Sequence, residues 1–321
     1  MQPLFILAPM MDRTDRHFRY LLRCISRRAL LTTEMVTSHA LLRGHDRGRL
    51  LGFDPLEHPV SLQLGGDRPA ELAACAVLAR DEGYDEVDLN VGCPSERVQS
   101  GNFGVCLMGE PERVRDCVLA MKQASGLPVT VKHRIGFDDR DSYEEMLRFV
   151  DVVAEAAPAR FAVHARKAWL KGLSPKENRS VPPLRYEEVY RLKRERPGLN
   201  IALNGGIASL DEGAAHLEQV DAVMIGRAVY DDPMLFSTLD SRFHAQPDAG
   251  LDRFALVRRM ADYAEGRLVE GERLRHVARH LLGLFSGVPG ARAWRRHLSE
   301  VCFRDGAGPE TLLEGLMLLR P

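Results

Sequence analysis

This sequence lacks several features that are typical of membrane proteins, secreted proteins and proteins with a structural zinc site. No stretch of the 321 residues approaches the roughly 20 consecutive apolar residues that a membrane-spanning helix needs. The N-terminal segment has no basic region, and its apolar run is too short for a signal peptide. The six cysteines include no C-x-x-C pair, which argues against a disulfide framework and against a structural zinc site. We therefore expect a cytoplasmic protein without a metal.

The sequence also lacks a strong net charge. Its formal charge is −1, so no long-range field attracts the whole protein to nucleic acid or to a membrane surface. Any site for a polyanion must come from a local cluster of cations. The composition, 45% hydrophobic and 28% charged, is that of a globular protein, and the length suits one large α/β domain with a smaller appendage.

Short apolar runs, many of them rich in β-branched residues, alternate with stretches that have helical spacing. Eight such runs each predict a β-strand. They cover residues 4–9, 30–35, 60–64, 86–90, 129–134, 160–165, 200–206 and 222–227. Eight βα units over this length predict an α/β fold of the (β/α)8 TIM barrel type. The alternative, a doubly wound open sheet, would need a G-x-G-x-x-G turn after an early strand, and the sequence has none.

The strand pattern stops after Tyr230, and the rest of the chain has helical spacing. Residues 235–250 have the composition of a connector, with a break at HAQPDAG. From residue 251 onward the sequence contains arginine but no lysine. We predict a catalytic barrel over residues 1–240 and a small all-helical domain over residues 251–321.

The carboxyl ends of the predicted strands carry many polar or flexible residues. Active-site residues of such barrels come from these ends, because all of them open onto one mouth. The residues concerned are Pro9, Met10, Glu34, Met35, Gln63, Asn90, Cys93, Lys132, Arg134, His164, Arg166, Asn204, Gly205, Gly206, Gly226 and Arg227. Their coincidence, rather than any single one of them, indicates a functional site.

Glycine-rich loops, NGGI and IGRA, follow the seventh and eighth predicted strands. Loops in these two places form the usual phosphate site of a barrel, because glycine lets backbone N–H groups approach a phosphate closely. Arg227 would add charge-assisted hydrogen bonds. Each loop alone could simply close a tight turn, but the two together favour a phosphate site.

Lys132 and Cys93 stand out because of their surroundings. An ammonium at an apolar strand end needs an anionic partner, which for Lys132 could be a reduced flavin or a barrel carboxylate such as Glu34 or Asp88. Cys93 lies between a glycine and a proline, in a sharp turn after a strand. That placement indicates a thiol that faces a ligand.

Two other groups of residues have ordinary structural explanations. Cys75 and Cys117 lie in helical patterns, where buried thiols are expected. His276 and His280 are four residues apart and could in principle hold a metal, but no acidic or thiol ligand lies beside them. A solvated basic helix face is therefore the expectation for these histidines.

The segments described so far, taken together, resemble the tRNA-dihydrouridine synthases. The matching stretches are LAPMMDRTDRHFR, TEM, QLGG, DLNVGCPSERVQSGNFGVCLM, VKHRIG, HARKAWLKGLSPKENR, NGGI and the five residues 226–230. HARKAWLKGLSPKENRSVPPL is most similar to the A-type bacterial subfamily, and the match runs to about residue 240. The resemblance implies a TIM-barrel flavoprotein that binds FMN, is recharged by NADPH, and reduces a D-loop uridine of tRNA, at positions 20 and 20a, to 5,6-dihydrouridine. The helical tail would be the family's RNA-binding domain.

The resemblance also implies roles for individual residues. FMN would be held by Ala8, Pro9, Met10, Gln63, Lys132, His164, Asn204, Gly205, Gly206, Gly226 and Arg227, the last five at its phosphate. Asn90 would contact the target uracil, and Cys93 would donate a proton to it. The tRNA would contact Lys176, Arg179 and Arg295, with Lys167, Lys171, Arg292, Arg296 and Trp294 as further candidates. We expect a monomer.

The chemistry of uracil explains why an acid is needed. Its C6 is electrophilic, and a hydride delivered there from reduced flavin leaves enolate character at C5, which must then be protonated. A thiol, with an ordinary pKa of about 8.5, holds a proton at neutral pH and can release it. Nucleophilic attack by Cys93 on C6 is the alternative role, but hydride arrival at the same carbon makes it redundant.

Three other functions remain open from the sequence. The chain could be another FMN-dependent barrel oxidoreductase, acting on a small pyrimidine or an enone. It could be a phosphosugar aldolase or isomerase that uses Lys132 as a Schiff-base amine. A non-catalytic RNA-binding module is the third possibility, and the many polar groups at the barrel mouth argue against it.

Overall fold

The computed structural model of this chain describes residues 4–319. The chain divides into two compact units, Met1–Met11 with Leu30–Gly226 and Asp12–Ala29 with Arg227–Pro321. The predicted boundary between residues 240 and 251 falls within the second unit. The assignment of separate catalytic and tRNA-binding domains stays a prediction.

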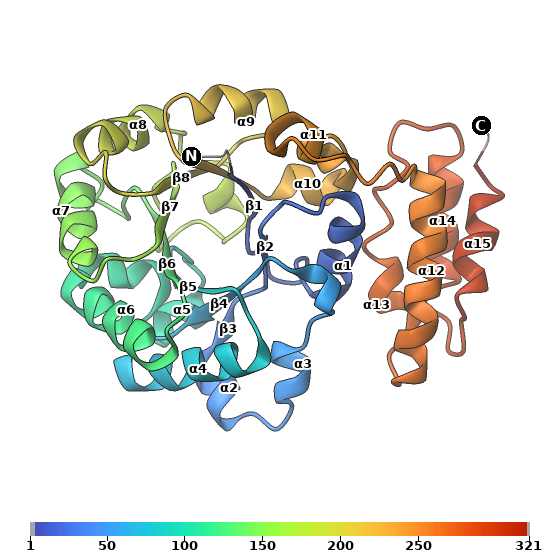
Figure 1. The fold of residues 1–321 in the computed structure, drawn as a ribbon, viewed down its shortest axis with the longest axis horizontal. Helices are drawn as coiled ribbons and strands as arrows, with labels where there is room; N and C mark the ends of the chain where they lie inside the picture. Colours follow the sequence, from blue (N-terminus) through green and yellow to red (C-terminus); the bar gives the residue numbers. More distant parts are fainter. Residues whose placement is uncertain (1–3, 320–321) are drawn as a thin grey trace. The chain divides into compact units, whose positions relative to one another are not determined.

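The first unit is built around a ring of parallel strands (Figure 1). The strands are β1 (Leu4–Leu7), β2 (Leu31–Thr32), β3 (Val36–Thr37), β4 (Val60–Gly65), β5 (Glu86–Val91), β6 (Val129–Arg134), β7 (Arg160–His164), β8 (Ile201–Asn204) and β9 (Ala222–Ile225). They follow the order β1-β9-β8-β7-β6-β5-β4-β2, with β3 beside β4. The ring closes where Leu7 N donates to Leu30 O (2.9 Å) and Leu30 N donates to Phe5 O (3.0 Å). The predicted (β/α)8 barrel is confirmed.

The second predicted strand, residues 30–35, is interrupted in the structure. Strands β2 and β3 both pair with β4, but residues between them do not continue the ladder. At the interruption Gln63 N donates to the Thr33 hydroxyl at 3.0 Å, so a side chain replaces the backbone carbonyl as acceptor. The apolar pattern therefore located β2, but residues 33–35 belong to no strand and β3 lies beyond the predicted range of 30–35.

Helices surround the strand ring of this unit (Figure 1). They are α2 (Ser38–Arg43), α3 (Arg47–Leu51), α4 (Pro69–Glu82), α5 (Glu96–Ser100), α6 (Pro111–Ser125), α7 (Tyr143–Ala154), α8 (Tyr186–Glu195) and α9 (Leu210–Leu217), with 3₁₀ turns at Pro55–Glu57, Gly104–Gly109 and Glu177–Arg179. The two long helices α4 and α6 end at Gly83 (φ 100°) and Gly126 (φ 72°). Both glycines adopt the left-handed conformation that favours glycine after a helix.

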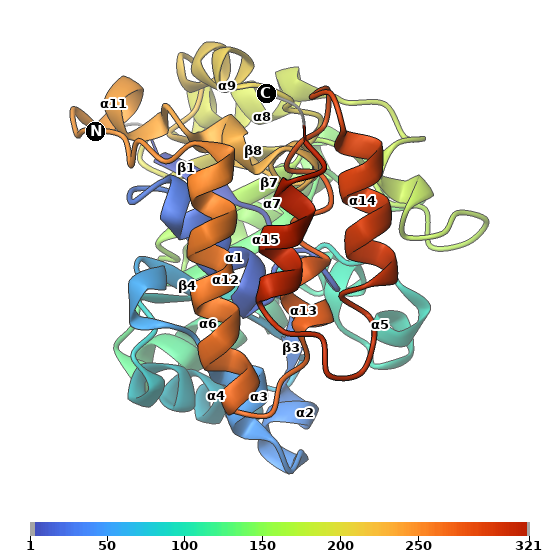
Figure 2. The same cartoon turned by 90° about the vertical axis from the view of Figure 1, so that its right-hand side faces the viewer.

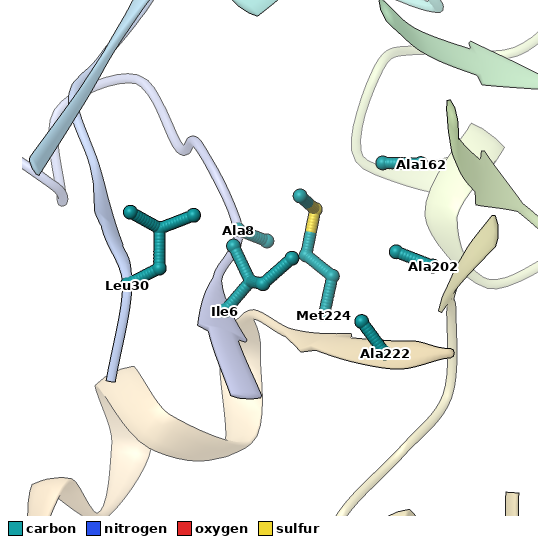
Figure 3. Packing of buried hydrophobic residues seen from close by; sticks show 7 residues of the cluster. All are labelled: Ile6, Ala8, Leu30, Ala162, Ala202, Ala222 and Met224. Atoms are coloured by element: carbon teal, nitrogen blue, oxygen red, sulfur yellow. The ribbon is translucent and has the colours of Figure 1, made fainter. Parts of the chain in front are cut away.

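One side of the barrel interior is apolar and lined by small side chains. Figure 3 shows seven buried residues whose side chains converge on one space. They are Ile6, Ala8, Leu30, Ala162, Ala202, Ala222 and Met224. Three alanines from neighbouring strands leave room that the longer Met224 and Ile6 side chains occupy. Such close packing leaves the polar residues of β4–β7 to form the other side of the interior.

The second unit is helical, as predicted for the C-terminal part of the chain. Its helices are α1 (Arg16–Ile25), α10 (Arg227–Asp231), α11 (Leu239–His244), α12 (Arg253–Val269), α13 (Leu274–Ala278), α14 (Ala291–Glu300) and α15 (Glu310–Leu316), with a 3₁₀ turn at Pro233–Phe236. Helix α15 packs against both α12 and α14 (Figure 2). Trp294 is fully buried in this packing, and a side chain at Gly315 would lie 2.8 Å from its ring. No helix within residues 4–319 has the length and apolar character that crossing a membrane requires.

Candidate functional site

A chain of hydrogen bonds crosses the polar side of the barrel interior. Thr130 Oγ1 donates to Asp88 Oδ1 (2.7 Å), and Gln63 Nε2 donates to Asp88 Oδ2 (2.7 Å). Asn90 Nδ2 in turn donates to Gln63 Oε1 at 2.9 Å. Burial raises the pKa of Asp88, and the two donated hydrogen bonds oppose that rise. Because Gln63 presents its amide nitrogen to the carboxylate, the orientation of both amide side chains is fixed.

Asn90 also shapes the turn that holds Cys93. Its side-chain oxygen accepts hydrogen bonds from the backbone N–H groups of Gly92 (3.2 Å) and Cys93 (3.0 Å). On the other side of the turn, Val105 N donates to Cys93 O at 3.1 Å. Gly104 has a φ of +67°, and a Cβ there would lie 2.6 Å from Cys93 O, so only glycine fits. The Cys93 backbone is therefore held from both sides.

The exposure of the cysteines follows the sequence prediction. Cys75 and Cys117 are fully buried in α4 and α6, and burial raises the pKa of each thiol to about 12. Cys93 is half-buried, and its thiol lies 3.7 Å from Ser95 Oγ. The expectation that Cys93 is accessible, and not a packing residue, is consistent with this placement.

Lys132 lies in strand β6, next in register to Asn90. The side chain is half-buried, and loss of solvation lowers the pKa of its ammonium to about 8. The positive charge of Arg134 lowers it further, while Asp88 and Cys93 act in the opposite direction. Among the described residues no direct salt bridge joins the ammonium to Asp88, although this carboxylate is near enough to raise the pKa of the ammonium by electrostatic attraction. Lys132 thus retains a charge that a ligand could neutralise.

The glycine loop after β8 lies against His164. Gly205 and Gly206 have φ angles of +117° and +78°. A Cβ on Gly205 would lie 2.8 Å from the His164 ring, and the hydroxyl of Tyr186 donates to Gly205 O at 2.7 Å. Asn204 Nδ2 donates to Met224 O at 2.8 Å, which joins this loop to the neighbouring strand. Both the backbone angles and the limited space require glycine here.

The glycine after β9 approaches the end of β1. A Cβ on Gly226 would lie 3.3 Å from Ala8 Cβ and 3.4 Å from Met10 Sδ. The structure therefore brings together three residues that the resemblance assigns to flavin binding. Arg227 follows as the first residue of α10 and is exposed.

The long loop between β7 and α8 folds around Asn178, a residue that the sequence analysis missed. Asn178 is fully buried, its amide donates to the carbonyls of Trp169, Leu173 and Ser174, and its Oδ1 accepts from Trp169 N at 2.7 Å. An asparagine at loop centre is a common turn residue, so its type alone gave no sign of this role.

Lysine and arginine side chains on this loop differ in their availability. Lys171 and Lys176 are exposed, and Arg179 is half-buried. Lys167 is instead held in the protein, 3.2 Å from Asp141 Oδ2 and above the Trp169 ring. Of the predicted cations on this loop, the two exposed lysines are the most accessible to a polyanion.

The arginines of α14 are exposed, but the tryptophan between them is not. Arg292, Arg295 and Arg296 lie on the surface of the helix. Trp294 is fully buried, donates its Nε1–H to Leu281 O (3.0 Å), and packs on Phe285. Trp294 is therefore a core residue and, unlike the arginines beside it, is not available to contact tRNA.

The expected solvated face at His276 and His280 is wrong for His280. His280 is buried, and its Nε2 lies 2.9 Å from Asp15 Oδ1, a partner 265 residues away. His276, which is half-buried, has Nδ1 at 3.9 Å from Glu272 Oε2, and His17 Nε2 lies 2.8 Å from the same oxygen.

The donor atoms of His17, Glu272 and His276 lie within 4.8 Å of one another. However, Glu272 is already paired with Arg267, and Asp15 with Arg279. The positive charges of Arg267 and Arg279 already neutralise these carboxylates and would repel a divalent cation, so the cluster favours ion pairs over a metal site. The prediction of no metal is untested.

Comparisons with known proteins agree with the geometry. The sequence profile of the family described as Dihydrouridine synthase (Dus) matches residues 6–316. A tRNA-dihydrouridine(20/20a) synthase from Synechocystis is 57% identical over 97% of this chain and 92% of its own length. The protein of the same name from Escherichia coli K12 is 52% identical over 98% of this chain and 91% of its own length.

Solved structures support the barrel fold alone. Morphinone reductase has a TM-score of 0.54 and 14% identity, and the match covers 74% of this chain and 85% of that protein. A 2-naphthoyl-CoA reductase complex has a TM-score of 0.59 and 9% identity, over 74% of this chain and 50% of that one. Because the family profile spans nearly the whole sequence and curated relatives share over half of its residues, this chain belongs to the dihydrouridine synthase family.

Proposed function

We propose that this protein reduces a D-loop uridine of tRNA, at positions 20 and 20a, to 5,6-dihydrouridine, with FMN as cofactor and NADPH as reductant. The substrate positions come from the names of its relatives, which share 51–57% of their residues with it. The observation that carries the proposal is the half-buried Cys93 thiol, held on a rigid turn beside the charged Lys132 side chain.

The residues present fit a flavin mononucleotide. Gly205 and Gly206 have conformations and surroundings that exclude side chains, which suits backbone N–H contact with a phosphate. Lys132 has a half-buried ammonium that forms no direct salt bridge among the described residues, and an electron-rich flavin ring would supply negative charge beyond that of nearby Asp88. Ala8, Pro9, Met10, Gln63, His164, Asn204, Gly226 and Arg227 complete the proposed set. When bound, the reduced flavin supplies the hydride for uracil C6.

The remaining chemistry falls to side chains of the protein. Cys93 holds a proton at neutral pH and gives it to C5 of the uracil, while Asn90 contacts the base. The Lys132 ammonium lies near enough to interact electrostatically with the sulfur, and it balances the negative charge left there after proton transfer. The fixed turn keeps the thiol oriented without further reorganisation.

The target base must leave the folded RNA to reach a barrel mouth, at a cost of a few kcal/mol. Contacts between cationic side chains and RNA phosphates offset this cost and orient the tRNA. Lys176, Arg179 and Arg295 are the proposed contacts, and all three are at least partly accessible. Membership of the family argues against the aldolase and the non-catalytic module, which do not require Cys93.

Replacing Cys93 by alanine tests the proposal. We expect reduction of tRNA uridine to fall by about 10²- to 10⁴-fold, because the general acid is lost, while NADPH still reduces the flavin at the normal rate. The two half-reactions are followed separately, by dihydrouridine content of the tRNA and by flavin absorbance. An equal fall in both would contradict the acid role, and turnover of free uracil without any need for tRNA would contradict the substrate.

A further inference from the structure

The Arg134 side chain joins two loops of the barrel. It is buried, at 4% exposure, and its Nε donates to Gly92 O at 2.9 Å. Its Nη1 donates to Lys167 O (3.1 Å) and to Asn178 O (3.0 Å), both in the loop between β7 and α8. One guanidinium therefore connects the turn that carries Cys93 with the loop that carries the proposed tRNA contacts.

On the side of the turn, Arg134 completes the restraint of a single peptide group. The Gly92–Cys93 peptide has its N–H bound by Asn90 Oδ1 and its carbonyl bound by Arg134. With both polar atoms fixed, the peptide plane cannot rotate, and the direction in which the Cys93 side chain leaves the backbone is set.

In the loop between β7 and α8, Arg134 binds the backbone at the buried centre of the loop. Asn178, whose carbonyl it contacts, is the fully buried centre of that loop. A second bridge runs between the same two loops, because Gln99 Nε2 donates to Pro94 O (2.8 Å) and to Leu170 O (3.2 Å). Two independent side chains thus hold the loops together.

The choice of arginine at this position is not explained by packing. Burying a guanidinium costs free energy, and within residues 4–319 no carboxylate pairs with Arg134. Its donors are used on three carbonyl oxygens instead, which a lysine could not reach at once.

We propose that Arg134 is a positioning residue for the protonation step, locking the Cys93 turn to the loop of Lys176 and Arg179. This inference rests on the proposed function, since it assigns Arg134 a role only through the acid. Through the hydrogen bonds of Arg134, the Cys93 sulfur is held in place relative to the loop that is proposed to contact the tRNA. Gln99 supports the same arrangement from the other end of the turn.

A double-mutant cycle tests this role. Arg134→Lys keeps the positive charge but removes the guanidinium, whose N–H groups reach three carbonyl oxygens. We expect single-turnover reduction of tRNA uridine to fall by about 10²-fold, with flavin reduction by NADPH unchanged. In a Cys93→Ala background the same substitution should have almost no further effect, because no acid remains to be positioned. If the role of Arg134 were purely structural, Arg134→Lys would lower the rate of uridine reduction by the same factor in the wild-type and Cys93→Ala backgrounds. That result would overturn the proposal.

The controls separate this inference from the proposed function. If Cys93→Ala leaves uridine reduction intact, the proposed function fails irrespective of Arg134. Arg115→Lys, at a half-buried position on α6 where the guanidinium pairs with Asp116 and Glu155, should leave every rate unchanged. If the Arg134→Lys protein does not bind flavin or shows no cooperative thermal unfolding, Gln99→Ala is used in its place in the double-mutant cycle. We expect Gln99→Ala also to have almost no further effect on uridine reduction in the Cys93→Ala background. If the losses in rate from the two substitutions were additive, the proposed positioning role would be wrong.

Discussion

At the scale of single residues, the charge of Lys132 depends on its burial. Loss of solvation lowers the pKa of the ammonium to about 8, so the positive charge is present below that pH and disappears as the pH rises through it. In an unfolded chain the group titrates near its ordinary value of 10.5. Between these two values the folded protein binds fewer protons than the unfolded one, and this residue's contribution to folding stability increases with pH.

The same titration predicts a pH dependence of flavin binding. If Lys132 supplies a cation to the flavin, the affinity of the apoprotein for FMN should fall between pH 7 and pH 9, because the charge is lost. Lys132→Met should bind FMN more weakly at pH 7 and with a flatter pH profile, as measured by quenching of FMN fluorescence. Lys122→Met, on α6, is the control and should follow the wild type. Identical pH profiles for wild type and Lys132→Met would show that this lysine does not contact the flavin.

At the scale of elements, the loops that follow the strands hold the residues of the proposed site. Glycines in these loops and at the ends of helices differ in whether the surrounding space or only the backbone angle requires glycine. Gly205 combines a φ of +117° with a neighbouring His164 ring, whereas Gly126 has a φ of +72° and open space around its missing Cβ. We therefore predict that function depends on Gly205, and that only local stability depends on Gly126.

A matched pair of alanine substitutions tests that distinction. Gly126→Ala should lower the free energy of unfolding by about 1 kcal/mol through backbone strain alone, with flavin content unchanged. Gly205→Ala should also displace His164 and the loop, so we expect the purified protein to lose most of its flavin. Flavin absorbance per protein and chemical denaturation measure the two effects. Equal flavin content in the two variants would argue against a phosphate site at this loop.

At the scale of the whole molecule, binding of a polyanion must arise from local clusters, because the net charge is only −1. The proposed contacts lie in both compact units, with Lys176 and Arg179 in the first and Arg295 in the second. Each phosphate contact releases counter-ions, which makes the affinity for tRNA fall steeply with salt.

Removing single contacts should change this salt dependence in steps. Lys176→Ala and Arg295→Ala should each weaken tRNA binding and reduce the slope of log affinity against log salt by about 1. Arg194→Ala, an exposed change on α8, serves as the control and should leave the slope as it is. Binding measured by filter retention over a range of salt concentrations decides this. An affinity that does not change with salt would rule out both clusters.

The sequence alone determined the features that depend on short-range order. Strand positions follow from apolar runs, the ends of α4 and α6 follow from Gly83 and Gly126, and the only partial burial of Cys93 follows from its turn. These features could be predicted because steric preference and side-chain periodicity act over a few neighbouring residues.

Only the tertiary structure decided which distant groups meet. The pairing of Asp15 with His280, the burial of Asn178 and the two loops joined by Arg134 all link residues far apart in the chain. It also decided that residues 12–29 belong with the C-terminal helices. Such contacts depend on how whole elements pack, and the energy that selects them, from burial and from satisfied hydrogen bonds, exists only once the elements have come together.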